Sequence, residues 1–388
     1  MTVEQVLQGL TLPFVTAELP GIGGSIKQIP EHFIVEEVPL YAAEGSGPHV
    51  YINLTRAGWT TRDVAIKLGQ YFDVPVRDIG YAGLKDRQAL TTQTFSVPGI
   101  DPQTAAARIS DQLPFQVNWV RPHHNKLRTG HLLGNRFTIF VADVVPEAAA
   151  RAAAIADRLL DRGLPNFYGP QRFGRRGDNA VQGYQALLGR GPRQRWLRDL
   201  VVSAFQAALF NLYLVRRWEA ELFFTLVQGD VAKKHATGGL FIVEDPVREQ
   251  PRFEAREISH TGPMFGSKMM AATGEAGELE ARVAAEVALP PGTFKKARVE
   301  GSRRLGRLLI EGLSISSAGP HLGVRTPQGE GEEAGPLDAG AVVEDAEQQT
   351  GLWLQFQLPK GAYATNVLRE FMKYEVSLAV DAQDTDSD

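Results

Sequence analysis

The alternation of apolar and polar residues predicts short strands along most of the chain. Runs rich in β-branched and aromatic side chains, bounded by turn residues, are typical of strands. Such runs occupy residues 33–38, 50–54, 93–97, 115–120, 137–141, 240–243 and 352–358. Because they occur near both ends of the chain, we expect the two ends to share a strand-rich outer domain.

Apolar residues at helical spacing predict helices between these strands. The predicted helices cover residues 61–73, 146–160, 193–218, 278–287 and 367–374. Thr60 or Thr61 offers a cap for the first helix, and Thr365 or Asn366 offers one for the last. Glycine and proline within residues 260–266 predict a turn there.

The length of 388 residues predicts two or three domains, or one core with a large insertion. Residues 166–311 are interpreted as that insertion. Residues 327–350 are rich in glycine and acid, so we expect a mobile surface segment, and we expect a disordered acidic tail at residues 381–388.

The absence of cysteine excludes disulfides, thiolate zinc sites and a cysteine nucleophile. No apolar run approaches the ~20 residues that a membrane span needs. Residues 1–8 lack the basic and apolar pattern of a signal peptide. We therefore expect a cytoplasmic protein that contacts no membrane.

The distribution of charge points to a polyanionic partner more strongly than the net charge does. The formal net charge is −4, but residues 121–198 contain fourteen basic and five acidic residues. A localised basic region is typical of nucleic-acid binding. The alternative is an arginine-rich surface exposed to solvent.

Residues 80–95 hold the most distinctive candidate for chemistry. Asp86 lies between Lys85 and Arg87, and nearby positive charge favours an ionised carboxylate. Such a carboxylate can act as a nucleophile or a general base. The alternative is a surface turn whose charges neutralise one another.

Two further segments, residues 121–137 and residues 294–309, carry basic residues suited to phosphate. Residues 121–137 contain no acid, and Arg128 and Arg136 are candidate RNA contacts. The three histidines of that segment indicate phosphate contact rather than a metal site, because no carboxylate accompanies them. Residues 294–309 carry six basic side chains and predict a second positive face.

The loop at residues 166–178 combines aromatic and basic side chains. Its arginines, Arg172, Arg175 and Arg176, are interpreted as RNA contacts beside aromatic faces that can stack on bases. The alternative is a packed surface loop whose arginines lie in solvent.

Six motifs together resemble those of the TruD-type tRNA pseudouridine synthases. They are Ala82-Gly-Leu-Lys-Asp-Arg-Gln-Ala89 with Thr92-Gln93, Gly134-Asn-Arg-Phe137, Asn166-Phe-Tyr-Gly-Pro-Gln-Arg-Phe-Gly174, Ala208-Leu-Phe-Asn211, Thr261-Gly-Pro263, and Pro359-Lys-Gly-Ala-Tyr-Ala-Thr-Asn-Val-Leu-Arg-Glu370. They occur in the family's order, and the resemblance runs from about residue 27 to residue 371.

The resemblance implies an isomerase that converts uridine to pseudouridine at position 13 of certain tRNAs. Asp86 then matches the catalytic aspartate and Lys27 its basic partner. Phe33 and Asn135 match the active-site aromatic residue and asparagine. Two further substrate contacts are implied: Phe137, at the place where other pseudouridine synthase families carry tyrosine, and Tyr363, where phenylalanine is expected.

The implied protein needs no cofactor and no metal, binds tRNA and is a monomer. Its target base must leave the stack, and Phe33, Phe137 and Tyr363 are the candidates for stacking on it. The residues leave open whether Asp86 attacks C6 of the base, attacks C1′ of the ribose, or removes a ribose proton.

The resemblance also implies the fold class, which is α/β with a mixed, mainly antiparallel sheet flanked by helices. Residues 1–164 and 313–388 would form a discontinuous catalytic domain, and residues 165–312 an inserted α/β TRUD domain that completes a cleft. A non-catalytic RNA-binding or RNA-folding protein is the competing hypothesis. A glycosidase-like hydrolase is weaker, because that chemistry needs two carboxylates and no second acid is evident near Asp86.

Overall fold

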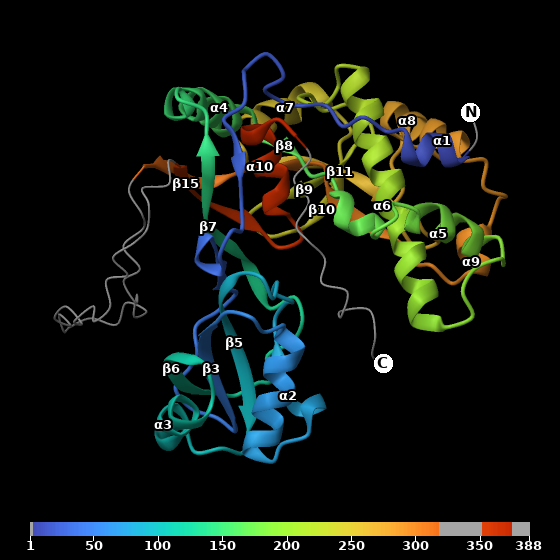
Figure 1. The fold of residues 1–388 in the computed structure, drawn as a ribbon. Helices are drawn as coiled ribbons and strands as arrows, with labels where there is room; N and C mark the ends of the chain where they lie inside the picture. Colours follow the sequence, from blue (N-terminus) through green and yellow to red (C-terminus); the bar gives the residue numbers. More distant parts are fainter. Residues whose placement is uncertain (1–2, 318–350, 375–388) are drawn as a thin grey trace. The chain divides into compact units, whose positions relative to one another are not determined.

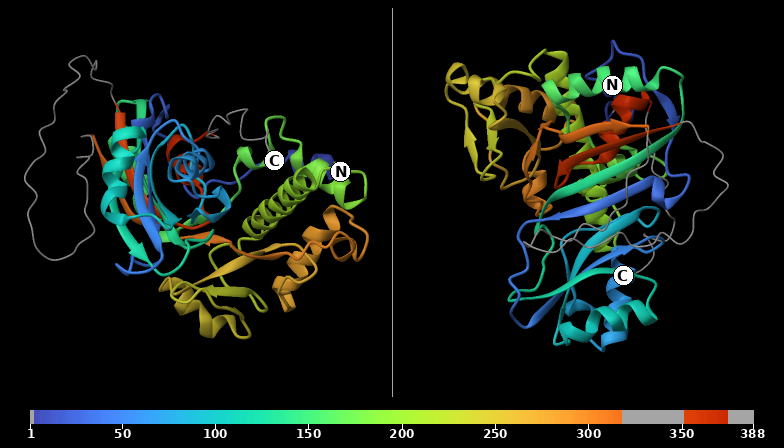
Figure 2. Two further views of the ribbon diagram at one scale, coloured as in Figure 1. Left: turned by 90° about the horizontal axis from the view of Figure 1, so that it is seen from below. Right: turned by 90° about the vertical axis from the view of Figure 1, so that its left-hand side faces the viewer.

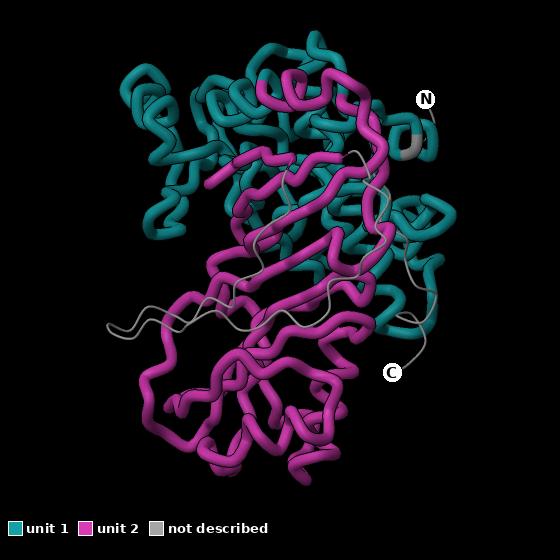
Figure 3. The backbone as a smooth tube through the Cα atoms, turned by 60° about the vertical axis from the view of Figure 1, so that its left-hand side comes forward, with its two compact units in different colours: residues 1–21, 154–310, 362–388 teal, residues 22–153, 311–361 magenta. Residues whose placement is uncertain are grey.

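The computed structural model describes residues 3–317 and 351–374. The chain divides into two compact units (Figure 3). Unit 1 comprises residues 1–21, 154–310 and 362–388, and unit 2 comprises residues 22–153 and 311–361. The segment 327–350 and the tail 381–388, for which mobility was expected, lie outside the described residues.

Unit 2 is built on a nine-stranded sheet in the order β14-β15-β7-β2-β5-β3-β6, with β1 paired to β7 and β4 paired to β5 (Figure 1). Its strands are β1 Gly23–Ser25, β2 Phe33–Pro39, β3 His49–Arg56, β4 Gly80–Tyr81, β5 Leu90–Pro98, β6 Gln116–His123, β7 Leu132–Val144, β14 Glu311–Ser316 and β15 Gly351–Pro359. Only the β2–β5 pair is parallel among the described strands. The predicted mixed, mainly antiparallel sheet flanked by helices is confirmed.

Helices α2 and α3 cover one face of this sheet. They span Thr61–Phe72 and Pro102–Gln112, with short 3₁₀ turns η1 Pro30–His32 and η2 Val76–Asp78 elsewhere in the unit. Helix α2 begins with a capping box, in which Thr60 and Asp63 each accept from the other's backbone N–H. Val64 and Leu68 of α2 pack with alternate residues of β3 and β5, as the period of two in a strand requires.

Unit 1 combines a four-stranded antiparallel sheet, β10-β9-β11-β12, with a long core helix, α6. Figure 2 shows α6 beside this sheet. The strands are β8 Leu164–Pro165, β9 Val231–Lys234, β10 Leu240–Ile242, β11 Ile258–Met264, β12 Ser302–Leu305 and β13 Arg307–Leu308. The helices are α1 Val3–Gln8, η3 Pro170–Phe173, α5 Asn179–Leu187, α6 Arg195–Glu219, α7 Pro246–Glu254, α8 Gly274–Glu286, α9 Thr293–Lys296 and α10 Ala364–Met372, while α4 Ala148–Arg162 begins in unit 2 and ends in unit 1.

Helix α6 is long and apolar enough to cross a membrane, the one such helix among the described residues. Its apolar window is 78% buried inside the structure, and the helix supplies much of the hydrophobic core of unit 1. A core helix of a folded domain meets the same length and composition criteria, so α6 is described as a core helix.

The two compact units differ from the predicted domains at the termini and at residues 154–164. Unit 1 includes residues 1–21 and 362–388, which the sequence analysis assigned to the catalytic domain. Residues of α10 pair with the N-terminal segment, where Glu370 accepts from the backbone N–H of Val15 at 2.8 Å. The functional division into residues 1–164 with 313–388 and residues 165–312 stays a prediction.

Two local predictions were wrong. Residues 260–266, expected to turn, lie largely in strand β11, which pairs with both β9 and β12. Gly262 serves close packing there, because a Cβ at that position would lie 2.7 Å from the Phe210 ring. Helix α10 begins at Ala364, so Thr365 and Asn366 lie inside it, and Asn366 donates to the carbonyl oxygen of Phe167 at 2.7 Å.

The predicted second positive face at residues 294–309 is also wrong in its C-terminal half. Arg303 lies 2.7 Å from Glu280, and both side chains are buried. Arg304 packs over Tyr168, 4.0 Å from the ring centre, and Arg307 is buried over Phe253. These arginines can lie in the interior because an ion pair or a cation–π contact with a residue distant in sequence stabilises each guanidinium group.

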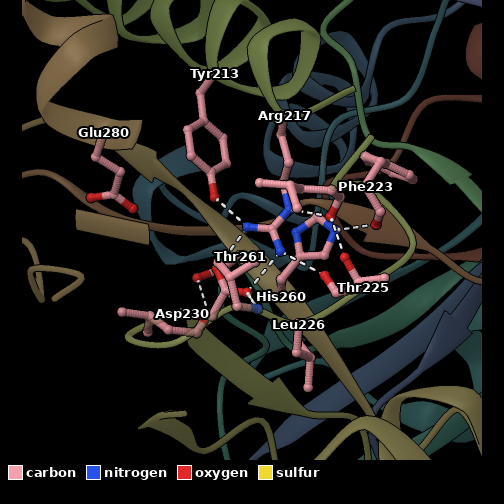
Figure 4. Close-up of polar contacts among 12 residues, drawn as sticks. Tyr213, Arg217, Phe223, Thr225, Leu226, Asp230, His260, Thr261 and Glu280 are labelled. Carbon is pink, nitrogen blue, oxygen red and sulfur yellow. Dashed lines mark hydrogen bonds and ion pairs between the residues drawn. The ribbon is translucent and has the colours of Figure 1, made fainter. Parts of the chain in front are cut away.

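A buried ion pair joins α6 to Asp230, the residue before strand β9 of unit 1 (Figure 4). Arg217 is fully buried and donates to both carboxylate oxygens of Asp230, at 2.6 and 2.7 Å. It also donates to the Tyr213 hydroxyl and to the carbonyl oxygens of Leu222 and Thr225. Burial opposes the guanidinium charge, yet Asp230 and Tyr213 together raise the pKa of Arg217.

We predict that Asp230→Ala destabilises the protein by about 3–5 kcal/mol, because it leaves the buried guanidinium of Arg217 without its carboxylate. Urea unfolding followed by circular dichroism measures this. The control is Glu286→Ala, which removes the half-exposed partner of the neighbouring Arg216 and should cost less than about 1 kcal/mol. Equal losses in the two variants would contradict a special role for the buried pair.

Candidate active site

Asp86 lies on the loop at residues 82–89, between β4 and β5 of unit 2. Its Oδ2 forms an ion pair with Lys27 Nζ, and its Oδ1 accepts from the backbone N–H of Gln88 at 3.0 Å. The Asp86 side chain is 32% exposed, whereas that of Lys27 is 7% exposed. The carboxylate is therefore held on one side by the protein and is open to solvent on the other.

Lys27 reaches Asp86 from an unusual backbone conformation. Its φ angle is 58°, a left-handed value that costs a non-glycine residue roughly 1–3 kcal/mol. The residue follows β1, which pairs with β7. Its Nζ lies 4.5 Å from the centre of the Phe33 ring, so a cation–π contact adds to the ion pair in fixing the ammonium group.

The strands β2 and β7 supply the apolar part of the site. Phe33 and Phe137 are buried and meet edge to face, with ring centres 6.4 Å apart. Phe137 also stacks on Phe356 of β15. Asn135 lies two residues before Phe137 and therefore on the same face of β7. Its Oδ1 is buried and has no hydrogen-bond partner among the described residues.

Lys85 points away from Asp86 and into the protein. Its Nζ donates to Glu37 Oε2 at 3.0 Å, and the exposed fractions of the two side chains are 4% and 3%. Desolvation lowers the pKa of Lys85, and Glu37 opposes that shift. Arg87 instead donates to the carbonyl oxygen of Gly58 at 3.1 Å. The two bases beside Asp86 in sequence thus anchor its loop at separate points.

A buried polar network continues beneath the loop. Thr61 Oγ1 accepts from the backbone N–H of Lys85 at 2.9 Å and donates to Gln93 Oε1. Arg56 donates to the same Gln93 oxygen at 2.8 Å, while Gln93 Nε2 donates to the carbonyl oxygen of Gly83 at 2.6 Å. Burial lowers the pKa of Arg56 to about 10. Side chains from β3, α2 and β5 therefore fix the backbone that carries Asp86.

Glu37 supports the candidate site, and it was not expected from the sequence. The alternation of side chains along β2 could have indicated it, because Glu37 shares one face of the strand with Phe33 and Val35. From the sequence, no second acid was evident near Asp86. The structure corrects this, since Glu37 lies under the same loop, but its carboxylate is buried and bonded to Lys85 and Gln93.

Three of the sequence motifs meet within unit 1, around the loop at residues 166–174. Asn211 of α6 accepts from the backbone N–H of Tyr168 and donates to its carbonyl oxygen, both at 2.8 Å. Arg304 donates to Asn166 Oδ1 at 2.6 Å. Tyr363, which is 38% exposed, lies beside Tyr168 with ring centres 5.9 Å apart. Tyr363 thus belongs to an aromatic and guanidinium cluster of unit 1.

The five arginines predicted to contact RNA have different environments. Arg175 and Arg176 are exposed, as is Arg128. Arg136 lies 3.7 Å from Glu36, so its charge is partly compensated. Arg172 donates to Ser203 Oγ at 2.6 Å and packs over Tyr168. Exposure therefore favours Arg128, Arg175 and Arg176 as positive charges available to RNA.

Among the described residues, no group of three or more His, Asp or Glu could hold a metal ion.

The family described as tRNA pseudouridine synthase D (TruD) matches the chain at residues 10–194 and 192–371. Curated proteins named tRNA pseudouridine synthase D are similar over nearly the whole length. One from Anaeromyxobacter sp. (strain Fw109-5) is 43% identical over 370 residues, covering 93% of this chain and 96% of its own. One from Thermus thermophilus is 41% identical over 378 residues, covering 97% of this chain and 96% of its own.

A crystal structure described as tRNA pseudouridine synthase D from Methanosarcina mazei has a similar fold. The TM-score is 0.73 at 23% sequence identity, and the match covers 96% of this chain and 98% of that one. At this identity the likeness concerns the fold.

We predict that Lys85→Met destabilises the protein by about 3–5 kcal/mol, because Glu37 becomes a buried carboxylate without its cation. The double variant Lys85→Met/Glu37→Gln should recover most of that loss. Urea unfolding checks both. Arg87→Met, which removes the other base beside Asp86, is the control and should cost about 1 kcal/mol or less. A double variant as unstable as Lys85→Met would show that Lys85 and Glu37 are not coupled.

Proposed function

This chain belongs to the TruD family of tRNA pseudouridine synthases, and from that premise we propose that Asp86 is the carboxylate with which it modifies uridine at position 13 of tRNA. The enzyme is an isomerase that converts uridine in tRNA to pseudouridine. The bond between N1 of uracil and C1′ of ribose breaks, and a bond between C5 and C1′ forms. N1 gains a hydrogen as C5 loses one, so no redox partner or group donor is consumed.

The observation that carries the proposal is the ion pair between Asp86 and Lys27. This pair joins the partly exposed carboxylate of Asp86, on the loop that carries the family-like motif, to the nearly buried ammonium group of Lys27. An oriented carboxylate can serve as nucleophile or base without a cofactor. Lys27 and the backbone N–H of Gln88 orient it.

The surroundings of Asp86 suit a flipped uracil. Phe33 and Phe137 provide an apolar floor near Lys27. Asn135 Oδ1, a buried acceptor without a protein partner among the described residues, is suited to a uracil N–H, and leaving such an acceptor unpaired costs about 1–3 kcal/mol. Tyr363 belongs to unit 1, and because its ring is partly exposed we propose it separately as a contact of the tRNA substrate, where stacking on a base is worth ~1–3 kcal/mol.

The proposed tRNA contacts follow the exposure of the arginines. Arg175 and Arg176 are exposed on a loop that unit 1 holds rigidly through Asn211, and they are assigned to phosphates. Phosphate contacts position a nucleic acid and make binding depend on salt. We further propose that the enzyme works in the cytoplasm as a monomer. Membership in an enzyme family favours catalysis over the non-catalytic RNA-binding alternative.

We predict that Asp86→Asn lowers pseudouridine formation in a tRNA transcript by about 10²–10⁴-fold or more, while tRNA affinity stays within about threefold. The Asn side chain keeps the shape of Asp but lacks its charge. Pseudouridine mapping and filter binding measure the two quantities. Asp111→Asn, an exposed change on α3 of the same unit, is the control. Full activity of Asp86→Asn would refute the catalytic assignment.

We predict that Arg176→Ala weakens tRNA binding and flattens the slope of log Kd against log salt by about 1, as the loss of one phosphate contact should. Arg172→Ala should leave that slope unchanged, because its guanidinium is already bonded to Ser203 and packed over Tyr168. Affinity titrations at several salt concentrations compare the two. Equal slopes for the wild type and Arg176→Ala would place Arg176 outside the interface.

A further inference from the structure

A polar pocket lies in unit 2, where residues 41–44 meet residues 123–131. Its volume is about 600 Å³. The pocket is lined by Tyr41, Glu44, His123, Asn125, Lys126, Arg128 and His131. Six of these side chains can donate a hydrogen bond, and Glu44 is the exception, which marks the pocket as a place for an acceptor-rich ligand.

A chain of polar contacts from Asn125 through Tyr51 and Tyr41 orients the His131 ring. The Tyr51 hydroxyl donates to the carbonyl oxygen of Asn125 at 3.0 Å. Burial raises the pKa of Tyr51 far above its usual range, so this hydroxyl stays a donor. The Tyr41 hydroxyl lies 2.7 Å from His131 Nδ1 and 3.5 Å from the Tyr51 hydroxyl. Tyr41 therefore engages Nδ1 of His131, and Nε2 is the ring nitrogen left to meet a ligand.

His123 is arranged in the same way. Its Nδ1 accepts from the backbone N–H of Glu44 at 3.3 Å, which places the proton of the neutral ring on Nε2. The residue is 3% exposed and stacks on Tyr41, with ring centres 5.3 Å apart. Among the described residues no protein group accepts from Nε2. His123 Nε2 is thus a donor of a nearly buried ring that lines the pocket, and it has no acceptor among the described residues.

The charges at the pocket favour an anion. Arg128 is exposed and has no acidic partner among the described residues, and Lys126 donates to the carbonyl oxygen of Arg77. Glu44, the one acid that lines the pocket, lies 3.5 Å from His124 Nε2. A tetrahedral phosphate can accept from several such donors at once, and guanidinium groups match its geometry.

The pocket is joined rigidly to the loop that carries Asp86. The backbone N–H of Gly130 donates to the carbonyl oxygen of Ala82 at 2.7 Å. Leu127 donates to Ser96 Oγ at 3.0 Å, and Gly80 packs so closely that a Cβ there would lie 2.1 Å from the Leu127 oxygen. A ligand held in the pocket would thus be fixed relative to residues 80–86.

We propose that this pocket binds a backbone phosphate of the tRNA substrate, with Arg128, His123 Nε2 and His131 Nε2 as the donors. The inference rests on the proposed function, because it takes tRNA as the ligand. It adds a contact in unit 2 that positions the strand relative to Asp86. Phosphate contacts of this kind set the register of a nucleic acid without reading its sequence.

The test measures binding of a tRNA transcript to four variants of the full chain at several salt concentrations. Arg128→Gln should raise Kd about 3–10-fold and flatten the salt slope by about 1. His131→Phe should raise Kd about 3–10-fold, because it removes a proposed donor, and it should change the slope less than Arg128→Gln does. Glu44→Gln should lower Kd about 2–3-fold, because it removes a like charge from the site of the phosphate.

Arg121→Gln is the matched control for charge. Arg121 is exposed on β6 and packs near Trp119, outside the residues that line the pocket, so its loss should leave both Kd and slope unchanged. Arg128 and Glu44 are exposed, and thermal melting will verify that their variants fold as the wild type does. Inorganic phosphate, added as a competitor at constant ionic strength, should raise Kd for the wild type but not for Arg128→Gln.

Two results would overturn the inference. One is an identical Kd and slope for Arg128→Gln and Arg121→Gln. The other is weaker binding by Glu44→Gln, which would mean that the carboxylate supports the loop instead of repelling a ligand. Neither result touches the proposed function, which is tested separately by pseudouridine formation in the wild type and its loss in Asp86→Asn.

Discussion

The ion pair between Lys27 and Asp86 is the interaction on which the candidate site depends. It joins two loops that lie 59 residues apart. One loop leaves β1, which is held by β7, and the other lies between β4 and β5. Lys27 adopts a left-handed backbone conformation to make the contact, and such strain persists only where the surrounding structure over-determines it. The nine-stranded sheet is that structure.

A second ion pair explains why the loop can present Asp86 to solvent without losing its position. Lys85 and Glu37 are both nearly fully buried, so their pairing resists disruption far more than an exposed pair would. Lys85 points inward to Glu37, while the next residue, Asp86, stays 32% exposed and pairs with Lys27. Gln93 and Thr61 complete the support by bonding to the loop backbone.

Arginine has two distinct uses in unit 1. Arg217, Arg303 and Arg307 are buried and bind acids, backbone carbonyls or aromatic faces. Arg175 and Arg176 remain exposed on the loop that follows the buried Tyr168. A sequence count treats these side chains alike, and this is why residues 294–309 gave the wrong expectation of a second positive face. Burial decides which of them can reach a phosphate.

Six strands of the large sheet, helices α2, α4, α6 and α8, the family and Asp86 could be read from the sequence, because hydrophobic period and motif order are local or linear signals, and Lys27 followed from the resemblance. The folded structure was needed to show that Lys85 faces Glu37, that residues 258–264 form a strand despite Gly262 and Pro263, and that His123 and His131 line one pocket. Each of these depends on partners distant in sequence, and a side chain's direction and burial are set by those partners and not by its neighbours along the chain.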